Sequence, residues 1–379
     1  MSSILVGQSG GPTAVINSSL AGIFYRALSS KKFDHIYGLR YGISGLLNED
    51  FYEIKNQEQI DLIRCNPGAF LGSVRFKIKD EYEKIVQIFK KYDVKCFFYI
   101  GGNDSMDTCN KIYQYFKEIN FDCKVIGVPK TIDNDLLIDH CPGYGSAAKF
   151  IATSIEELYL DTNVYNKGRV NIVEIMGRDA GWLTASASIA SINKMGPDFI
   201  YLPESKFDIK KFLEDVLDTY NKKHTVLIAV SEGIKIDDEK HLLTNNDFDV
   251  FGHIQLGGIG QKLAEIIKKE LNLPIRAIEL NLLQRCAFHI ASKFDFDEAY
   301  DIGIYAVDLA LSNKSGVMAI KDKVIQLNDV ANKVKYFPIN WIINGNQISE
   351  EYLKYVLPLI KGEVNLKYEN GIPKYYKID

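Results

Sequence analysis

The chain contains 379 residues, of which 46% are apolar, so it can bury a large core and exceeds the usual length of one compact domain. A formal net charge of -4 and a pI near 6.0 disfavour nucleic acid or an anionic membrane surface as the main partner. No run of about eighteen apolar residues is present, and Met1 leads directly into a strand-like run, so we expect a cytoplasmic protein without a membrane span. The six cysteines lack metal-type spacing, which favours free thiols over a zinc site.

Short runs of β-branched, aromatic and other apolar residues alternate with longer stretches of helical periodicity. This alternation predicts an α/β fold, and the length predicts two lobes, each a mainly parallel sheet flanked by helices. Ligands of such sheets gather at the carboxyl ends of the strands. The tail from about residue 322 is less periodic, and we expect its aromatic residues to pack across the lobes. The predicted strands cover residues 4–6, 96–100, 124–128, 170–175 and 226–230.

The first predicted strand ends in a glycine-rich turn at Gly10 and Gly11, followed by Pro12 and an amphipathic stretch over residues 14–28. Glycines allow the backbone to approach an anion, proline suits the first helical turn, and the amides of a helix start attract phosphate. The pattern therefore predicts a phosphate-binding helix start beside the glycines. A purely structural turn is the alternative, because the sequence of a P-loop and the full spacing of a dinucleotide-binding turn are both absent.

Residues 68–75 contain a second glycine-rich turn and end with Arg75. A guanidinium group can bind two phosphate oxygens at once, so Arg75 is a candidate ligand of a phosphate group. A surface charge or an interlobe salt bridge is the alternative for any single arginine.

The next strand end consists of two glycines followed by Asn103, Asp104 and Ser105, and a helix-like run covers residues 106–116. Backbone amides, a carboxylate and a hydroxyl are therefore expected together at a helix start. A carboxylate beside a phosphate site predicts magnesium. An ordinary helix cap is the alternative for Asp104.

The most informative stretch is residues 127–135, which follow a predicted strand and contain Lys130, Thr131, Asp133 and Asp135 within six positions. Lysine neutralises phosphate oxygens, and a threonine hydroxyl hydrogen-bonds one of them. A carboxylate can take the proton of a sugar hydroxyl while a phosphoryl group is transferred. This combination predicts phosphoryl transfer, with a polar turn after a strand as the alternative.

These segments resemble, in type and order, those of the phosphofructokinase family, whose members carry a glycine-rich first turn, an FLGSxR segment, a GGD-type strand end and a TIDND loop. The resemblance spans nearly the whole chain and implies a phosphofructokinase-like fold. Further matching segments cover residues 173–178, 197–204, 229–232 and 276–285.

Residues 251–258 resemble the family's LGHIQRGG segment but contain leucine where an arginine is needed. We therefore interpret residues 276–285 as the matching segment and residues 234–270 as an insertion.

Within the matching segment, Arg276 and Arg285 have the family's spacing, whereas Leu282 departs from it. ATP-dependent members usually place there a histidine that contacts the sugar phosphate. The resemblance thus implies that this contact is absent or supplied by another residue, such as His253 if the fold brings it near.

Two side chains indicate the phosphoryl donor, because ATP-dependent members have glycine at the positions that resemble Asp104 and Lys130. A carboxylate at Asp104 would clash with the inner phosphate of a nucleotide, whereas pyrophosphate ends before it reaches that point. Lys130 can pair with the donor phosphate. Thr108 replaces a further glycine that lies beside the ribose. The resemblance therefore implies a pyrophosphate-dependent member.

The resemblance also implies Mg²⁺ as a cofactor, held by Asn103, Asp104 and Asp135. Asn103 stands where the family has an aspartate, and an amide binds metal more weakly than a carboxylate does. We therefore expect the two aspartates to carry more of the metal contact than in other members.

The same resemblance implies that fructose 6-phosphate binds in the second lobe. It implies that Asp133 accepts the proton of the 1-hydroxyl while the phosphoryl group of pyrophosphate moves in line. The reaction is then a reversible step of glycolysis or gluconeogenesis. Arg169 and Arg276 match positions that a neighbouring subunit supplies, which implies a homodimer or homotetramer with shared active sites. The expected catalytic residues are Asp104, Lys130, Asp133 and Arg178. The expected donor-binding residues are Gly10, Gly11, Arg75, Asn103, Asp104, Ser105 and Lys130. The expected substrate-binding residues are Thr131, Asp133, Asp135, Arg169, Met176, Gly177, Arg178, Glu232, Arg276 and Arg285.

We predict a phosphoryl-donor lobe from residues 1–143 and about 284–325, and a sugar-phosphate lobe from residues 144–283 and about 326–379.

Two alternative functions remain at this point. One is an ATP-dependent 6-phosphofructokinase whose loop shifts to accommodate Asp104. The other is a degenerate, non-catalytic subunit that binds a sugar phosphate or a nucleotide. Asn103 and Leu282 favour this alternative, and the intact Thr131, Asp133, Asp135 and Arg178 disfavour it. Sedoheptulose 7-phosphate is a further possible acceptor.

Overall fold

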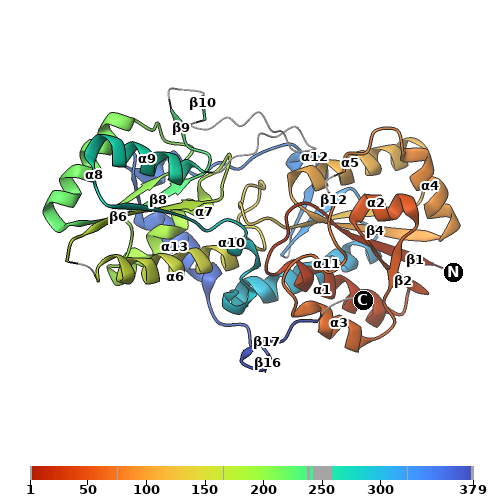
Figure 1. The fold of residues 1–379 in the computed structure, drawn as a ribbon. Helices are drawn as coiled ribbons and strands as arrows, with labels where there is room; N and C mark the ends of the chain where they lie inside the picture. Colours follow the sequence, from red (N-terminus) through yellow and green to blue (C-terminus); the bar gives the residue numbers. More distant parts are fainter. Residues whose placement is uncertain are drawn as a thin grey trace.

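The computed structural model describes residues 2–74, 76–164, 166–236, 240–241, 258–321 and 323–376, with only the backbone for residues 236, 240 and 241. Two α/β lobes lie side by side, each with its own mainly parallel sheet flanked by helices (Figure 1). The predicted fold class is thereby confirmed. Among the described helices, none combines the length and the apolar character that a membrane span requires.

The first lobe contains a seven-stranded sheet that is parallel except at its two edges. Its central strands are buried on both faces, which explains why they form continuous apolar runs in the sequence. In spatial order the strands are β13 (Lys323–Gln326), β12 (Val317–Ile320), β5 (Lys124–Pro129), β4 (Val94–Gly101), β1 (Ser3–Gln8), β2 (His35–Leu39) and β3 (Phe51–Glu53).

The second lobe contains a four-stranded sheet in which all strands are parallel. Strands β6 and β8 lie at its centre and are buried along nearly their whole length, so their sequences are again almost entirely apolar. In spatial order the strands are β11 (Ile275–Glu279), β6 (Arg169–Ile175), β8 (Thr225–Ser231) and β7 (Phe199–Tyr201).

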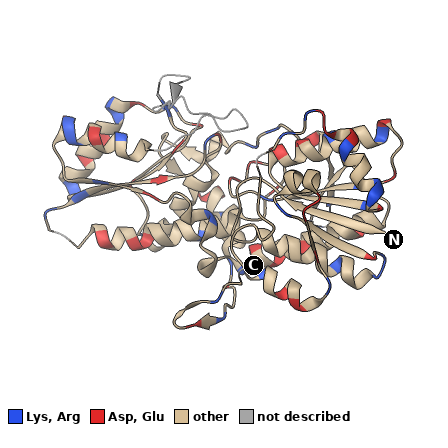
Figure 2. Cartoon of the chain, turned by 45° about the vertical axis from the view of Figure 1, so that its right-hand side comes forward, with Lys and Arg blue, Asp and Glu red and all other residues tan. Residues whose placement is uncertain are grey.

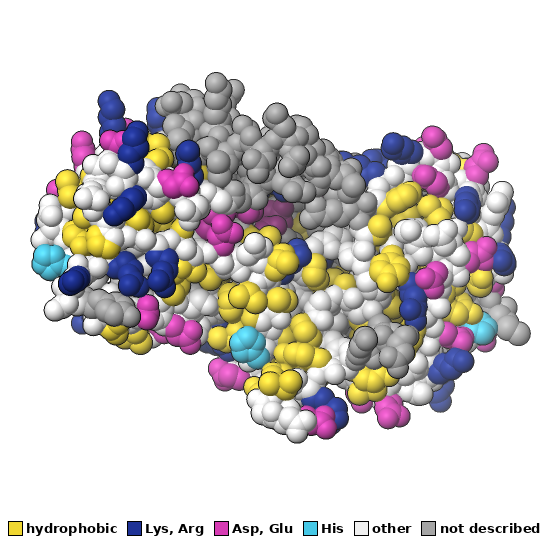
Figure 3. Space-filling view, viewed as in Figure 1, with side chains coloured by type: hydrophobic (Ala, Val, Ile, Leu, Met, Phe, Trp, Pro, Cys, Tyr) yellow, Lys and Arg dark blue, Asp and Glu magenta, His cyan; other side chains and the backbone are white. Residues whose placement is uncertain are grey.

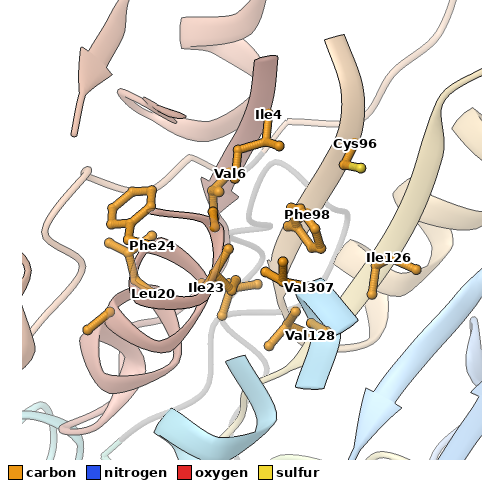
Figure 4. Close-up of a cluster of buried hydrophobic side chains, with 14 of the residues drawn as sticks. Ile4, Val6, Leu20, Ile23, Phe24, Cys96, Phe98, Ile126, Val128 and Val307 are labelled. Atoms are coloured by element: carbon orange, nitrogen blue, oxygen red, sulfur yellow. The ribbon is translucent and has the colours of Figure 1, made fainter. Parts of the chain in front are cut away.

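Two helices, α1 (Ile16–Ser30) and α11 (Lys293–Leu311), pack together on one face of the first sheet. A Cβ atom at Gly22 would lie 2.1 Å from the backbone oxygen of Tyr300, so only glycine permits this close crossing. Figure 4 shows the core beneath them, where side chains from both helices meet alternate residues of β1 and β4. The opposite face is covered by α4 (Tyr82–Lys91) and α5 (Asn103–Glu118).

Helices also cover both faces of the second sheet. On one face lie α6 (Tyr144–Thr162), α7 (Trp182–Ala185) and α13 (Glu350–Val356). On the other face lie α8 (Ile209–Lys223) and α9 (Ile259–Leu271).

The predicted insertion, residues 234–270, is only partly described. Residues 237–239 and 242–257, which include His253 and most of the segment that resembles LGHIQRGG, lie outside the described residues. The end of the predicted insertion forms α9, whose Leu263 and Ile267 are fully buried in the core of the second lobe. This part is therefore an integral element of the lobe.

The C-terminal part of the chain contacts both lobes. Residues of α12 (Leu327–Val330) belong to the core of the first lobe, whereas Phe337 and Tyr352 belong to that of the second. The hairpin of β16 (Tyr368–Glu369) and β17 (Ile372–Pro373) follows. The domain boundaries given above stay a prediction.

Charged residues of both signs are distributed over the helices of both lobes (Figure 2). The face shown in Figure 3 likewise carries basic and acidic side chains on both lobes. A phosphate-bearing ligand must therefore find positive charge locally.

Candidate active site

A cavity of about 400 Å³ lies between the lobes, at the carboxyl ends of strands from both sheets. The first lobe contributes the residues that follow β1, β4 and β5, and the second lobe contributes those that follow β6 and β8. This is the position at which parallel α/β sheets bind ligands. Of the residues predicted from the sequence, Gly10, Gly11, Asn103, Asp104, Ser105, Lys130, Thr131, Asp133, Asp135, Met176, Arg178, Glu232 and Arg285 line the cavity.

The turn after β1 lines the cavity, but the helix that follows starts later than predicted. Gly10 has φ 75°, a conformation that glycine adopts without strain, and α1 begins only at Ile16. Pro12 therefore lies in the turn and not in the first helical turn, because the positive φ at Gly10 directs the chain into an irregular loop. A Cβ atom on Gly11 would lie 3.0 Å from a guanidinium nitrogen of Arg285, so the glycine leaves room for this arginine.

A hydrogen-bond network fixes this turn from behind. The side-chain oxygen of buried Asn17 accepts hydrogen bonds from Gln8 Nε2 and from the backbone N–H of Phe70, each 2.9 Å long. Ser73 Oγ donates to the backbone oxygen of Gly10 at 2.6 Å. Residues 70–73 therefore lie against the glycine-rich turn. Arg75 lies outside the described residues.

After β4, helix α5 begins directly at Asn103, and its N-cap residue is Gly102. Asp104 is in the first helical turn, one position beyond the first helical residue, so it is not the N-cap residue. Asp104 lines the cavity. Thr108 lies one turn further on, where its hydroxyl donates to the backbone oxygen of Asp104 at 2.9 Å, and it does not line the cavity.

The loop after β5 carries the largest set of functional groups. Thr131 forms an isolated parallel β-bridge with Gly143. The Thr131 hydroxyl accepts a hydrogen bond of 3.0 Å from the backbone N–H of Asp133. Asn134 turns the chain at φ 54°, and its side chain donates to the Tyr355 hydroxyl at 2.8 Å. The loop is thus held by contacts outside the cavity, while Asp133 and Asp135 line it.

Lys130 is almost completely buried, and its ammonium group donates to the backbone oxygen of Gly11. Burial lowers the pKa of Lys130 to about 8, although Asp133 and Asp135 favour the charged form. Burial also raises the pKa values of Asp133 and Asp135, and the Asp135 carboxylate raises that of Asp133 further. A lysine and a carboxylate with pKa values displaced toward neutrality therefore share one cavity, as acid-base chemistry requires.

Two oxygen atoms in the cavity wall have no hydrogen-bond partner in the described part of the protein. Asn103 Nδ2 donates to one carboxylate oxygen of Asp135 at 2.9 Å. The other oxygen of Asp135 and the amide oxygen of Asn103 are both buried without a partner. Among the described residues no cluster of three His, Cys, Asp or Glu side chains forms a metal site. The paired oxygens fit a hard cation that keeps several of its waters, as Mg²⁺ does.

The second lobe provides a different set of groups. Gly177 has φ 134° and donates its backbone N–H to Glu232 Oε1 at 3.2 Å. Burial raises the pKa of Glu232 to about 7. Arg178 lines the cavity, and its buried Nε has no hydrogen-bond partner in the described structure. The backbone N–H of Met176 donates to Gln284 Oε1 at 3.3 Å, which ties this strand end to the segment that carries Arg285.

Comparisons with known proteins agree with this geometry. A protein-family comparison matches residues 3–310 to "Phosphofructokinase". This chain belongs to the phosphofructokinase family. It is 38% identical over 396 residues to the "Pyrophosphate--fructose 6-phosphate 1-phosphotransferase" of Halomonas elongata, with 98% of this chain and 94% of the relative covered. The relative with the same description in Methylococcus capsulatus is 36% identical, with 97% and 94% covered.

Solved structures lead to the same family. The crystal structure of "Pyrophosphate-dependent phosphofructokinase" from Nitrosospira multiformis superposes with a TM-score of 0.90 at 37% identity, covering 99% of this chain and 95% of that one. The family fold therefore extends over the full length of the chain.

Two predicted residues lie apart from the others in this phosphofructokinase-family chain. Arg169 is the first residue of β6 and Arg276 is on β11, so both lie toward the amino ends of their strands. They line a separate surface depression that also includes Lys268 and Lys269 of α9. Leu282 is 53% exposed and does not line the cavity.

Other residues of the cavity wall were not predicted from the sequence. Ser9 precedes the glycine-rich turn and Asp179 follows Arg178, so their positions at strand ends could have identified them. Asn332 and Val334 come from the aperiodic tail, and no local pattern marks them.

Proposed function

We propose that this chain transfers the terminal phosphoryl group of pyrophosphate to the 1-hydroxyl of fructose 6-phosphate, giving fructose 1,6-bisphosphate (EC 2.7.1.90). The reaction is reversible, because donor and product phosphates are of similar energy. The observation that carries the proposal is the presence of both Asp104 and Lys130 in the wall of one cavity, beside the glycine-rich turn. A nucleotide would bring its inner phosphate against the Asp104 carboxylate, whereas pyrophosphate gains the Lys130 ammonium group.

In this proposal Asp133 is the general base. It lines the cavity between the two lobes, and its raised pKa makes its carboxylate a stronger base than an exposed aspartate. It takes the proton of the 1-hydroxyl as the oxygen attacks the terminal phosphorus and the bond to the bridging oxygen breaks. The backbone N–H of Asp133 donates to the Thr131 hydroxyl, which restrains the backbone from which the carboxylate extends.

Positive groups surround the position of the transferred phosphoryl group. Lys130 and Arg178 line the cavity from opposite lobes, and their charges offset the negative charge on the equatorial oxygens. The backbone N–H groups of Gly10 and Gly11 add uncharged hydrogen-bond donors. The Lys130 ammonium group donates to the Gly11 oxygen, so the lysine and the turn form one binding site for the phosphoryl donor.

Residues Asn103, Asp104 and Asp135 would hold Mg²⁺ in this proposal. The unpartnered oxygens of Asn103 and Asp135 supply two ligand positions, and Asp104 lines the same wall. When bound there, the cation neutralises charge on the donor phosphates.

The sugar is held by the second lobe. In this proposal Met176, Gly177 and Glu232 contact its hydroxyl groups, and Arg285 binds its 6-phosphate. Met176, Glu232 and Arg285 line the cavity, which supports this assignment. Glu232 accepts a hydrogen bond from Gly177 and retains free acceptor positions toward the cavity.

A neighbouring subunit would complete the sugar site with Arg169 and Arg276, which lie on a surface separate from the cavity of their own chain. This predicts a homodimer or homotetramer in the cytoplasm. Mixing two inactive variants, Asp133→Asn and the double variant Arg169→Ala, Arg276→Ala, should restore activity in hybrid oligomers. Failure of complementation after subunit exchange would argue against shared sites.

The proposal is tested by the rate of fructose 1,6-bisphosphate formation by the purified protein with Mg²⁺, fructose 6-phosphate and either pyrophosphate or ATP. We expect turnover with pyrophosphate alone. Turnover with ATP alone would favour the ATP-dependent alternative, and the absence of turnover with both donors would favour the non-catalytic subunit.

A further inference from the structure

A segment of the aperiodic tail forms part of the cavity wall and has no role in the proposed reaction. Asn332 and Val334 line the cavity together with the start of α5. They belong to residues 331–335, which lead from α12 in the first lobe to the core of the second. We call residues 331–335 the crossing segment.

The upstream end of the crossing segment is fixed on α5. Asn332 Nδ2 donates to Asp107 Oδ1 at 2.8 Å, and Lys111 contacts the other oxygen of Asp107 at 2.6 Å. Asn332 has φ 58°, a left-handed conformation in which asparagine is well tolerated. The Asn332 side chain therefore acts as a tether between the tail and α5.

The downstream end is fixed on the loop that carries the catalytic aspartates. The backbone N–H of Lys335 donates to the backbone oxygen of Asp135 at 2.7 Å. The Lys335 ammonium group donates to the backbone oxygens of Ile138 and Asp139, each at 2.9 Å. Trp182 Nε1 donates to the Lys335 oxygen at 3.0 Å. Val334 thus lies between two anchored ends.

The tether is attached to α5 about one helical turn after Asp104, and both Asp104 and Asn332 line the cavity. Residues three positions apart in a helix share one face, so Asp107 lies one turn further along α5 than Asp104. A donor that extended past the Asp104 carboxylate along this face would meet the crossing segment at Asn332.

We propose that the crossing segment, tethered by Asn332 to Asp107, is a second determinant of donor size that excludes the nucleoside part of a nucleoside triphosphate. This inference rests on the proposed pyrophosphate dependence. Asp104 acts by charge on the inner phosphate, whereas the crossing segment acts by occupying space. Removing the Asp104 carboxylate alone therefore leaves the nucleotide path closed.

The experiment adds Asn332→Gly to an Asp104→Gly background. Glycine adopts the positive φ of this position, so the substitution removes the tether and keeps the backbone conformation. The matched control is Asn313→Gly, at an exposed position with φ 65° after α11. Titration calorimetry with Mg²⁺ measures binding of adenosine 5′-(β,γ-imido)triphosphate, and of methylenediphosphonate as a pyrophosphate analogue, without requiring turnover.

We expect Asn332→Gly to raise the affinity for the imidotriphosphate on the order of tenfold over Asp104→Gly alone, with no gain from Asn313→Gly. Binding of methylenediphosphonate should be unchanged, which also reports an intact donor site. Asp107→Ala releases the same tether from the other side and must give the same gain if Asn332→Gly loses methylenediphosphonate binding.

Equal imidotriphosphate affinity with and without the tether would overturn the inference. The proposed function fails on a different observation, namely a wild-type protein that turns over ATP and not pyrophosphate. The two failures are therefore distinguishable.

Discussion

The two sides of the cavity differ in how their ligand-binding groups are held. On the donor side, Lys130 is bonded to the Gly11 oxygen, and the turn that contains Gly11 is buttressed by Asn17 and Ser73. On the sugar side, Arg178 Nε has no partner in the described structure, and Glu232 is bonded to one backbone N–H. The donor side is held by hydrogen bonds within the protein, except at the Asn103 and Asp135 oxygens proposed for Mg²⁺, whereas the sugar side offers polar groups for a ligand to contact.

This difference predicts that substitutions on the two sides of the cavity affect different kinetic constants. Substitutions on the donor side should change the handling of the donor, and those on the sugar side should change the affinity for the sugar. Asp133 lies where the two sides meet, so its loss should affect the chemical step itself.

Asp133→Asn should have the largest effect, because it removes the general base. We expect kcat to fall roughly a thousandfold with small changes in either KM, measured by initial rates with pyrophosphate. Asp139→Asn is a suitable control, since it lies on the same loop and outside the cavity. A residual kcat within a few fold of wild type would exclude Asp133 as the base.

The wild-type pH profile of kcat/KM should have two limbs. The rate should fall at low pH as Asp133 becomes protonated, at a pH above the ordinary range of an aspartate because burial raises its pKa. It should fall again above about pH 8 as buried Lys130 loses its proton. A profile that continues to rise through pH 9 would contradict the assignment of Lys130 as a charged donor ligand.

Glu232→Gln should act on the sugar side only. The pKa of about 7 means that Glu232 is ionised above neutrality, where its carboxylate is the stronger hydrogen-bond acceptor. We expect the KM for fructose 6-phosphate to rise about tenfold at pH 8 and less at pH 6, with the KM for pyrophosphate unchanged. Glu214→Gln, on the exposed surface of α8, serves as the control. An equal rise in both KM values would remove the distinction between the two sides.

Asn17→Ala should have the smallest effect on turnover and a clear effect on stability. It leaves Gln8 Nε2 and the N–H of Phe70 without their buried partner, which should cost about 1–3 kcal/mol of unfolding free energy. We expect the KM for pyrophosphate to rise and that for the sugar to stay constant, because the network supports the glycine-rich turn. Chemical denaturation and initial rates measure the two effects, with Asn110→Ala on α5 as the control.

The sequence was informative where function follows a strand end. The runs before Gly10, Asn103 and Lys130 are apolar because their strands are buried on both faces, and parallel strands bring their carboxyl ends to one edge. Most of the residues predicted from these strand ends therefore line one cavity.

Other features depend on tertiary contacts that no local pattern encodes. Asn332 reaches the cavity through its bond to Asp107, which is distant in sequence. The late start of α1 follows from the backbone conformation at Gly10. The apparent insertion over residues 234–270 includes a core helix, because the apolar face of α9 fits the second lobe.

The central claim is that Asp104 and Lys130 make the donor side specific for pyrophosphate. The most direct measurement is the ratio of kcat/KM for pyrophosphate to kcat/KM for ATP, in the wild type and in the double variant Asp104→Gly, Lys130→Gly. We predict that the ratio falls by at least about two orders of magnitude, mainly through loss of pyrophosphate use. An unchanged ratio in a folded double variant would contradict the account.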